Sequence, residues 1–144
     1  MPGLNDFEEI AASLAQARTV AVVGCSPDPA RPSNGIARYL VRAGYDVIPV
    51  NPEAKEALGR RCYPSLAAIP EEIAIDIVDV FRRSEYVAGI ADEAIGRGVR
   101  FFWMQDGVVD EDAARRLRDA GIGVAMDRCI YRDRETVGRG LPLA

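Results

Sequence analysis

The chain has 144 residues, 49% of them hydrophobic and 28% charged, which is typical of a single globular domain. Its 18 basic and 22 acidic residues give a formal net charge of −4, and this balance disfavours nucleic acid as a partner. The sequence contains no histidine. This composition excludes histidine general bases, histidine metal ligands and nucleophiles activated by histidine.

The N-terminal segment is acidic and carries no basic region followed by an apolar run, so it does not resemble a signal peptide. No apolar stretch approaches the ~20 residues that a membrane span requires, so we expect no membrane partner. Three widely spaced cysteines, Cys25, Cys62 and Cys129, predict neither a disulfide framework nor a metal site. These features favour a cytoplasmic protein with reduced thiols.

Short apolar runs alternate with amphipathic stretches along the chain, after an initial helix that we expect over roughly residues 6–17. Near-continuous apolar runs predict strands buried on both faces of a parallel sheet. These runs cover residues 19–23, 46–50, 75–81, 101–104 and 122–126. Apolar residues at helical spacing predict helices over residues 34–43, 84–96 and 110–120, the second of them capped by Ser84. Residues 53–69 have a weaker pattern, with a brief edge strand expected at residues 61–63.

This alternation predicts a doubly wound α/β fold, in which helices cover both faces of a parallel sheet and form three layers. We expect a single domain over residues 5–130. Residues 131–144 combine glycine, proline and mixed charges, and we expect an irregular or partner-dependent tail there.

The loop after the first predicted strand is the strongest candidate for a ligand site. In an open α/β sheet, ligands bind beyond the carboxyl ends of the strands, beside the first strand. Residues 24–35 supply backbone N–H groups, the hydroxyls of Ser26 and Ser33 and the guanidinium of Arg31 before the next helix begins. Together with the positive end of that helix, these groups make an anion site. The alternative is that this loop only shapes the chain and caps the helix.

A dinucleotide fits this loop poorly. The G-x-G-x-x-G pattern is missing, because Gly24 is followed by Cys25, Ser26 and Pro27. The second predicted strand ends at Asn51-Pro52, without the acidic residue that receives a ribose hydroxyl. Residues 28–61 carry six basic and four acidic side chains, so a segment of net charge +2 stands beside the loop. This excess favours a ligand with more phosphate than NAD, although part of it is also explained by a solvated helix face.

Five groups of residues occur in an order that resembles a known family. They are residues 19–33, 50–52, 62–66, 79–83 and 127–130. Together they are similar to the bacterial and archaeal CoA-binding domain proteins and to the nucleotide-binding domain of the succinyl-CoA synthetase alpha subunit. This resemblance covers roughly residues 14–130. It implies a Rossmann-like fold that binds coenzyme A. Because the residues show no catalytic constellation, we expect a module that binds CoA or an acyl-CoA as a small-molecule ligand without catalytic activity of its own.

The resemblance also implies which residues hold the cofactor. The loop after the first strand would hold the diphosphate, the end of the second strand would line the adenine, and two further strand ends would border the pantetheine arm. The predicted ligand-binding residues are Gly24, Cys25, Ser26, Arg31, Ser33, Asn34, Asn51, Pro52, Lys55, Phe81, Arg82, Gln105 and Gly107. The last four are explained equally well as core or turn residues.

Two features depart from the family pattern. Cys25 occupies a loop position that is usually small, and a helix N-terminus would favour its thiolate, which suggests a mixed disulfide with a CoA thiol. The tail lacks the acid–histidine pair of related chains. An NAD(P)-binding or redox-sensing domain remains the alternative function, and a subunit that only docks a partner enzyme is a third hypothesis. A homodimer is the default assembly for so small a domain.

Overall fold

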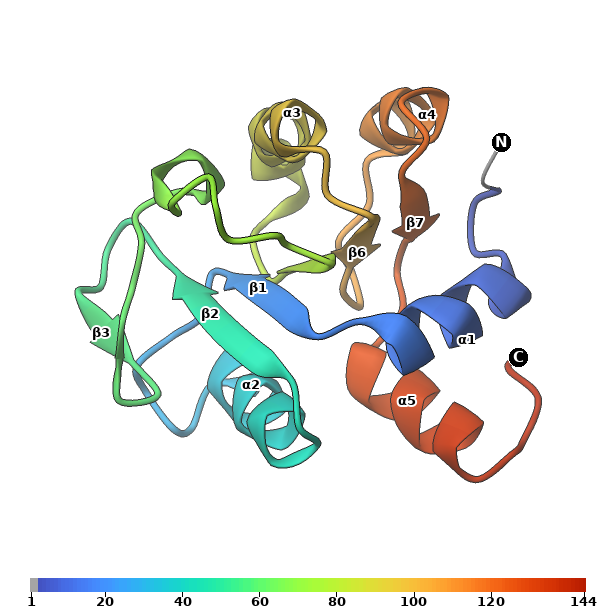
Figure 1. The fold of residues 1–144 in the computed structure, drawn as a ribbon, viewed down its shortest axis with the longest axis horizontal. Helices are drawn as coiled ribbons and strands as arrows, with labels where there is room; N and C mark the ends of the chain where they lie inside the picture. The colour runs from blue at the N-terminus through green and yellow to red at the C-terminus, as the bar shows by residue number, and fades with distance from the viewer. Residues whose placement is uncertain (1–2) are drawn as a thin grey trace.

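The computed structural model describes residues 3–144 as three layers around one parallel sheet (Figure 1). The sheet has the strand order β2-β1-β5-β6-β7, and all four neighbouring pairs are parallel. Its strands are β1 (Thr19–Val23), β2 (Asp46–Val50), β5 (Ile77–Val80), β6 (Phe101–Met104) and β7 (Gly123–Ala125). The predicted Rossmann-like α/β fold is confirmed.

Helices cover both faces of the sheet, as the apolar strands require. One face carries α1 (Phe7–Gln16), α2 (Pro32–Arg42) and α5 (Ile130–Gly138), and the other carries α3 (Val87–Arg97), α4 (Glu111–Asp119) and the short 3-10 helix η1 (Leu66–Ala68) (Figure 1). The buried residues accordingly form two clusters, one on each side of the sheet.

Polar caps set the limits of two helices where the sequence predicts them. The Asp6 side chain accepts a hydrogen bond from Glu9 N at the start of α1, and the Asp110 side chain accepts one from Ala113 N at the start of α4. Ser84 does not cap α3 as predicted. It begins the 3-10 turn η2 (Ser84–Tyr86), and its hydroxyl accepts a hydrogen bond from Val109 N, which ties this turn to the loop after β6.

The outer edge of β2 is covered by residues 56–63. The two-residue strands β3 (Glu56–Ala57) and β4 (Arg60–Arg61) form an antiparallel hairpin, in place of the single edge strand predicted at residues 61–63. Tyr63 then donates its N–H to Pro49 O at 3.1 Å and accepts from Asn51 N at 2.9 Å. These bonds satisfy part of the exposed strand edge and fix the direction in which the chain leaves β2.

The prediction of an irregular tail after residue 130 is wrong for most of that segment, because α5 continues to Gly138. Ile130 is fully buried in the cluster on this face of the sheet. Tyr131 packs edge-on against Tyr39 of α2, with ring centroids 4.7 Å apart, and the Tyr39 hydroxyl donates to Glu135 at 2.7 Å. Tertiary contacts with α2, rather than the polar local sequence, therefore order this helix.

One acid lies in the core without a partner. Asp79 of β5 is fully buried, and neither of its carboxylate oxygens has a hydrogen-bond partner among the described residues. Its neighbours across the sheet are Val22 and Trp103. Burial raises the pKa of Asp79 well above its ordinary range, since an unpartnered carboxylate in an apolar site is costly.

We predict that Asp79 destabilises the protein as the pH rises. Its proton is retained in the folded state but lost from the unfolded chain above about pH 4, so the free energy of unfolding falls with pH by up to about 1.4 kcal/mol per pH unit. The Asp79→Asn variant lacks this dependence. Denaturant unfolding measured from about pH 5 upward should show its stability rising relative to wild type.

The exposed acid Asp119 provides the control, because Asp119→Asn should follow the wild-type pH profile. If the Asp79→Asn and wild-type profiles run parallel over the whole range, the assignment of a neutral, buried Asp79 is wrong.

Candidate functional site: a cleft at the carboxyl edge of the sheet

Three hollows meet where β1, β2 and β5 end. The first, called here the arginine hollow, has a volume of about 400 Å³. It is lined by Gly24, Arg31, Asn51, Glu53, Phe81, Arg82, Arg83 and Tyr86. Three guanidinium groups face one carboxylate in this set, so the hollow carries a positive charge at the position where the fold places ligands.

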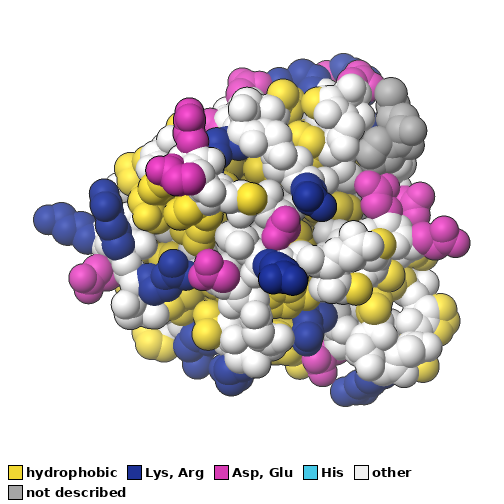
Figure 2. All heavy atoms as spheres, in the orientation of Figure 1, with side chains coloured by type: hydrophobic (Ala, Val, Ile, Leu, Met, Phe, Trp, Pro, Cys, Tyr) yellow, Lys and Arg dark blue, Asp and Glu magenta, His cyan; other side chains and the backbone are white. Residues whose placement is uncertain are grey.

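The other two hollows adjoin the first. The apolar hollow, about 200 Å³, is lined mainly by Val23, Val50, Pro52, Leu66 and Ile90, and it shares Arg82 and Tyr86 with the arginine hollow. The lysine hollow, about 390 Å³, lies beside the β3–β4 hairpin. Its lining residues are Asn51, Pro52, Ala54, Lys55, Arg61, Cys62 and Pro64. Figure 2 shows Lys and Arg side chains projecting on the side of the molecule where β3 lies.

Predicted ligand residues from the loops after β1, β2 and β5 therefore line one hollow. Arg31, Asn51, Phe81 and Arg82 are separated by up to 51 positions in the sequence but line one hollow. The Arg82 guanidinium lies 4.3 Å from the centroid of the Tyr86 ring, a cation–π contact that holds it at the border of the arginine and apolar hollows.

The backbone of the first loop does not present its amides as expected. Gly24 N and Cys25 N both donate to Val50 O, at 2.7 and 3.3 Å, and Ser26 N donates to Ser33 Oγ at 3.0 Å. Because these N–H groups are occupied within the protein, they are not free for a phosphate in this conformation. The anion-binding groups that the structure presents at this loop are guanidiniums, hydroxyl protons and the N–H of Ser33 in the first turn of α2, which has no acceptor among residues 3–144.

Several predicted ligand residues instead hold the loops in place. Asn51 donates from Nδ2 to Cys25 O at 3.0 Å and accepts from Glu53 N at 2.9 Å, which joins the loops after β1 and β2. Asn34 is 3% exposed and donates to Ser26 O at 2.9 Å, while its Oδ1 accepts from Arg38. These side chains shape the cleft. This agrees with the alternative that the loop after β1 shapes the chain.

The Cys25 thiol lies in the core and not in the cleft. Its side chain is fully buried in the cluster between the sheet, α1 and α2. Burial raises the pKa of Cys25 to about 12, with smaller contributions from Cys62 and Asp79. The expected reactive thiolate is therefore wrong: desolvation outweighs any effect of the helix, which begins only at Pro32.

Gln105 and Gly107 lie one strand further, outside the three hollows. Gln105 is 4% exposed, and its Oε1 accepts a hydrogen bond from Ile130 N at 3.1 Å. Gly107 has a positive φ of 78° and donates its N–H to the Asp127 carboxylate at 2.7 Å. Both residues connect the loop after β6 to the segment after β7.

The fold also brings to the cleft two residues that the sequence did not predict as ligand residues. Arg83 directly precedes the turn η2 and Tyr86 lies in it, while Arg61, one of the basic residues of the segment 28–61, reaches the lysine hollow from β4. The adjacent pair Arg82-Arg83 was the one available signal for Arg83. Nothing local marks Tyr86, since its role depends on where η2 packs. A separate hollow of about 160 Å³ at the amino edge, lined in part by Glu9, Asp76 and Arg100, contains none of the predicted residues.

This fold and cleft define a domain of the Rossmann-like class with a positively charged cleft at the carboxyl edge of its sheet. Residues 18–135 match the CoA binding domain family, and the chain belongs to that family. The uncharacterized protein YneT of Bacillus subtilis is 43% identical over 129 residues, which are 90% of this chain and 92% of YneT. The family membership expected from the sequence is confirmed.

Further relatives link the domain to larger enzymes. A solved hypothetical protein from Pyrococcus horikoshii OT3 has 37% identity and a TM-score of 0.85, with 94% of each chain covered. Acetate–CoA ligase [ADP-forming] I of Archaeoglobus fulgidus is 40% identical over 63 residues, which are 44% of this chain and only 9% of the ligase. None of the helices in residues 3–144 is long and apolar enough to cross a membrane.

We predict that Gly24→Ala destabilises the fold, because the added methyl group would press on the chain that follows β5. Gly24 has φ +86°, and an added Cβ would lie 3.1 Å from Phe81 O and 3.1 Å from Arg82 Cδ. Strain in the left-handed region together with this contact should lower the free energy of unfolding by about 1–3 kcal/mol. Denaturant unfolding of the purified variant measures this loss.

The exposed helical residue Gly96 has open space around it and serves as the matched control. Gly96→Ala should stabilise the protein by about 0.5–1 kcal/mol, because alanine is the better helix former. Equal effects of the two substitutions would contradict the close approach at Gly24.

Proposed function

We propose that this chain binds coenzyme A or an acyl-CoA in the three joined hollows at the carboxyl edge, as a binding protein without chemistry of its own. The observation that carries the proposal is the meeting of Arg31, Arg82 and Arg83 in one hollow, in a member of the CoA binding domain family. A diphosphate placed there would be neutralised by guanidinium groups.

The neighbouring hollows suit the adenosine part of the cofactor. The apolar hollow offers Val23, Val50 and Leu66 to the adenine ring, and Pro52 lies between it and the lysine hollow. Lys55 and Arg61 form no ion pair among residues 3–144, so they are available to a 3′-phosphate. This arrangement would use all three phosphates of coenzyme A.

The proposed absence of catalysis follows from the side chains at the cleft. The sequence has no histidine, the Cys25 thiol is buried with a raised pKa, and Asp79 is enclosed in the core. Glu53 is the one acid that lines the arginine hollow, and it faces guanidiniums. A binding function therefore explains the side chains at this cleft better than an acid–base mechanism does.

We predict that the 3′-phosphate contributes to affinity. Isothermal titration should show that dephospho-CoA binds about tenfold more weakly than CoA, because it leaves Lys55 and Arg61 without their phosphate partner. NAD should bind more weakly still. Equal affinity for CoA and dephospho-CoA would refute the role of the lysine hollow, and tighter binding of NAD would favour the pyridine-nucleotide alternative.

We also predict that Arg31→Gln weakens CoA binding by about threefold to tenfold, with a larger effect at low salt, because an exposed charge–phosphate contact is partly screened. Arg42→Gln is the matched control, since Arg42 lies at the opposite end of the same helix, α2. Titration at two ionic strengths measures both variants. If the two substitutions have the same effect, a specific diphosphate contact at Arg31 is excluded.

A further inference from the structure

The Gln105 side chain carries an unused donor at the start of α5. The side chain is oriented by its Oε1, which accepts the N–H of Ile130, the first residue of α5, at 3.1 Å. Its amide nitrogen Nε2 has no hydrogen-bond partner among residues 3–144, although the residue is only 4% exposed. Nε2 is not among the fully enclosed unpartnered side-chain atoms of the described residues, so it can donate to a group outside the protein.

The first turn of α5 adds further donors beside this amide. Asp133 N closes the first turn on Cys129 O at 3.0 Å, whereas the N–H groups of Tyr131 and Arg132 have no acceptor within the described chain. Such N-terminal N–H groups point out of the helix along its axis. Tyr131 is 43% exposed, so this turn lies at the protein surface.

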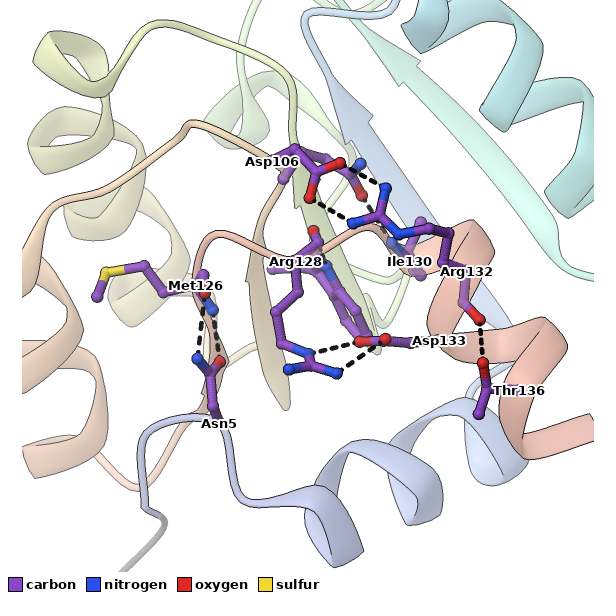
Figure 3. Close-up of polar contacts among 10 residues, drawn as sticks. Asn5, Asp106, Met126, Arg128, Ile130, Arg132, Asp133 and Thr136 are labelled. Carbon is purple, nitrogen blue, oxygen red and sulfur yellow. Dashed lines mark hydrogen bonds and ion pairs between the residues drawn. The ribbon is translucent and has the colours of Figure 1, made fainter. Parts of the chain in front are cut away.

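The charges around these donors favour a neutral acceptor. Arg132 forms a bidentate ion pair with Asp106, at 2.7 and 2.8 Å, and Arg128 forms one with Asp133, at 2.7 and 2.9 Å (Figure 3). Asp127 accepts from Gly107 N nearby. Three carboxylates thus surround two guanidiniums that are already paired. A carbonyl oxygen suits this environment better than a phosphate or a carboxylate does.

The donors lie one strand beyond the arginine hollow, on the face of the sheet covered by α1, α2 and α5, whereas the apolar hollow lies on the face covered by α3 and α4. Gln105 N donates to Val80 O at 3.3 Å, which places Gln105 beside Phe81 of the arginine hollow. Phe81 packs in the cluster under α2 and α5, and Gln105 reaches the first turn of α5 on that face. Since neighbouring strands are about 4.8 Å apart, an arm extending from a diphosphate at β1 crosses β5 to reach Gln105.

We propose that Gln105 Nε2 and the N-terminal N–H groups of α5 bind the thioester carbonyl of an acyl-CoA, so that the chain prefers acyl-CoA to free CoA. This inference rests on the proposed function and extends it to the substrate class. A free thiol is a weak hydrogen-bond acceptor and leaves these donors to water, whereas a thioester oxygen accepts from them.

Titration of the wild-type chain with acetyl-CoA and with CoA tests this preference. We expect acetyl-CoA to bind about tenfold more tightly. Gln105→Glu keeps an acceptor for Ile130 N but removes the free donor, so the ratio of the two affinities should fall to about one, chiefly through weaker binding of acetyl-CoA. Gln105→Met, of similar volume, should also abolish the preference and covers the case in which the glutamate variant does not fold.

Gln16→Glu is the matched control, because it makes the same chemical change at an exposed position at the end of α1. It should retain the wild-type preference. Equal wild-type affinities for the two ligands would overturn the inference. So would an equal loss of both affinities in the Gln105 variants, which would instead assign these donors to a carbonyl of the pantetheine arm. If neither ligand binds the wild-type chain, the proposed function itself fails.

Discussion

The cleft depends on the main-chain contacts that join three strand ends at the carboxyl edge. Val50 O at the end of β2 accepts from Gly24 N, and Val23 O at the end of β1 accepts from Phe81 N at 2.8 Å. The positive φ of Gly24 lets the chain turn away from β1 without a side chain striking the Phe81 backbone. These contacts bring Arg31 and Arg82 into one hollow, although they belong to different loops.

The same edge concentrates positive charge in a protein whose net charge is −4. Three arginines from the loops after β1 and β5 line the arginine hollow, and Lys55 and Arg61 line the adjoining one. Several acids outside the three hollows are paired with arginines, as Asp92 is with Arg116 and Asp106 with Arg132. A phosphate-rich ligand would therefore be drawn to the cleft and not to the surface as a whole.

Much of the fold could be predicted from the sequence, because strands buried on both faces leave long apolar runs such as residues 19–23 and 101–104. The helix α5 could not, since its stability comes from Tyr39 and the buried Ile130 and not from its own polar residues. Seven of the predicted ligand residues line the hollows, and their role in binding stays a prediction: Gly24, Arg31, Asn51, Pro52, Lys55, Phe81 and Arg82. The loop amides were misjudged, because the bond from Gly24 N to Val50 O depends on strand pairing that no local pattern reveals. Tyr86 was not predicted because its place at the cleft depends on where η2 packs.

A crystal structure of the chain grown with coenzyme A tests the central claim most directly. We predict diphosphate density between the Arg31 and Arg82 guanidiniums, with the adenosine against Pro52 and the 3′-phosphate near Lys55. Cofactor bound in the hollow at the amino edge, beside Asp76 and Arg100, would contradict it, as would an empty carboxyl-edge cleft at saturating cofactor.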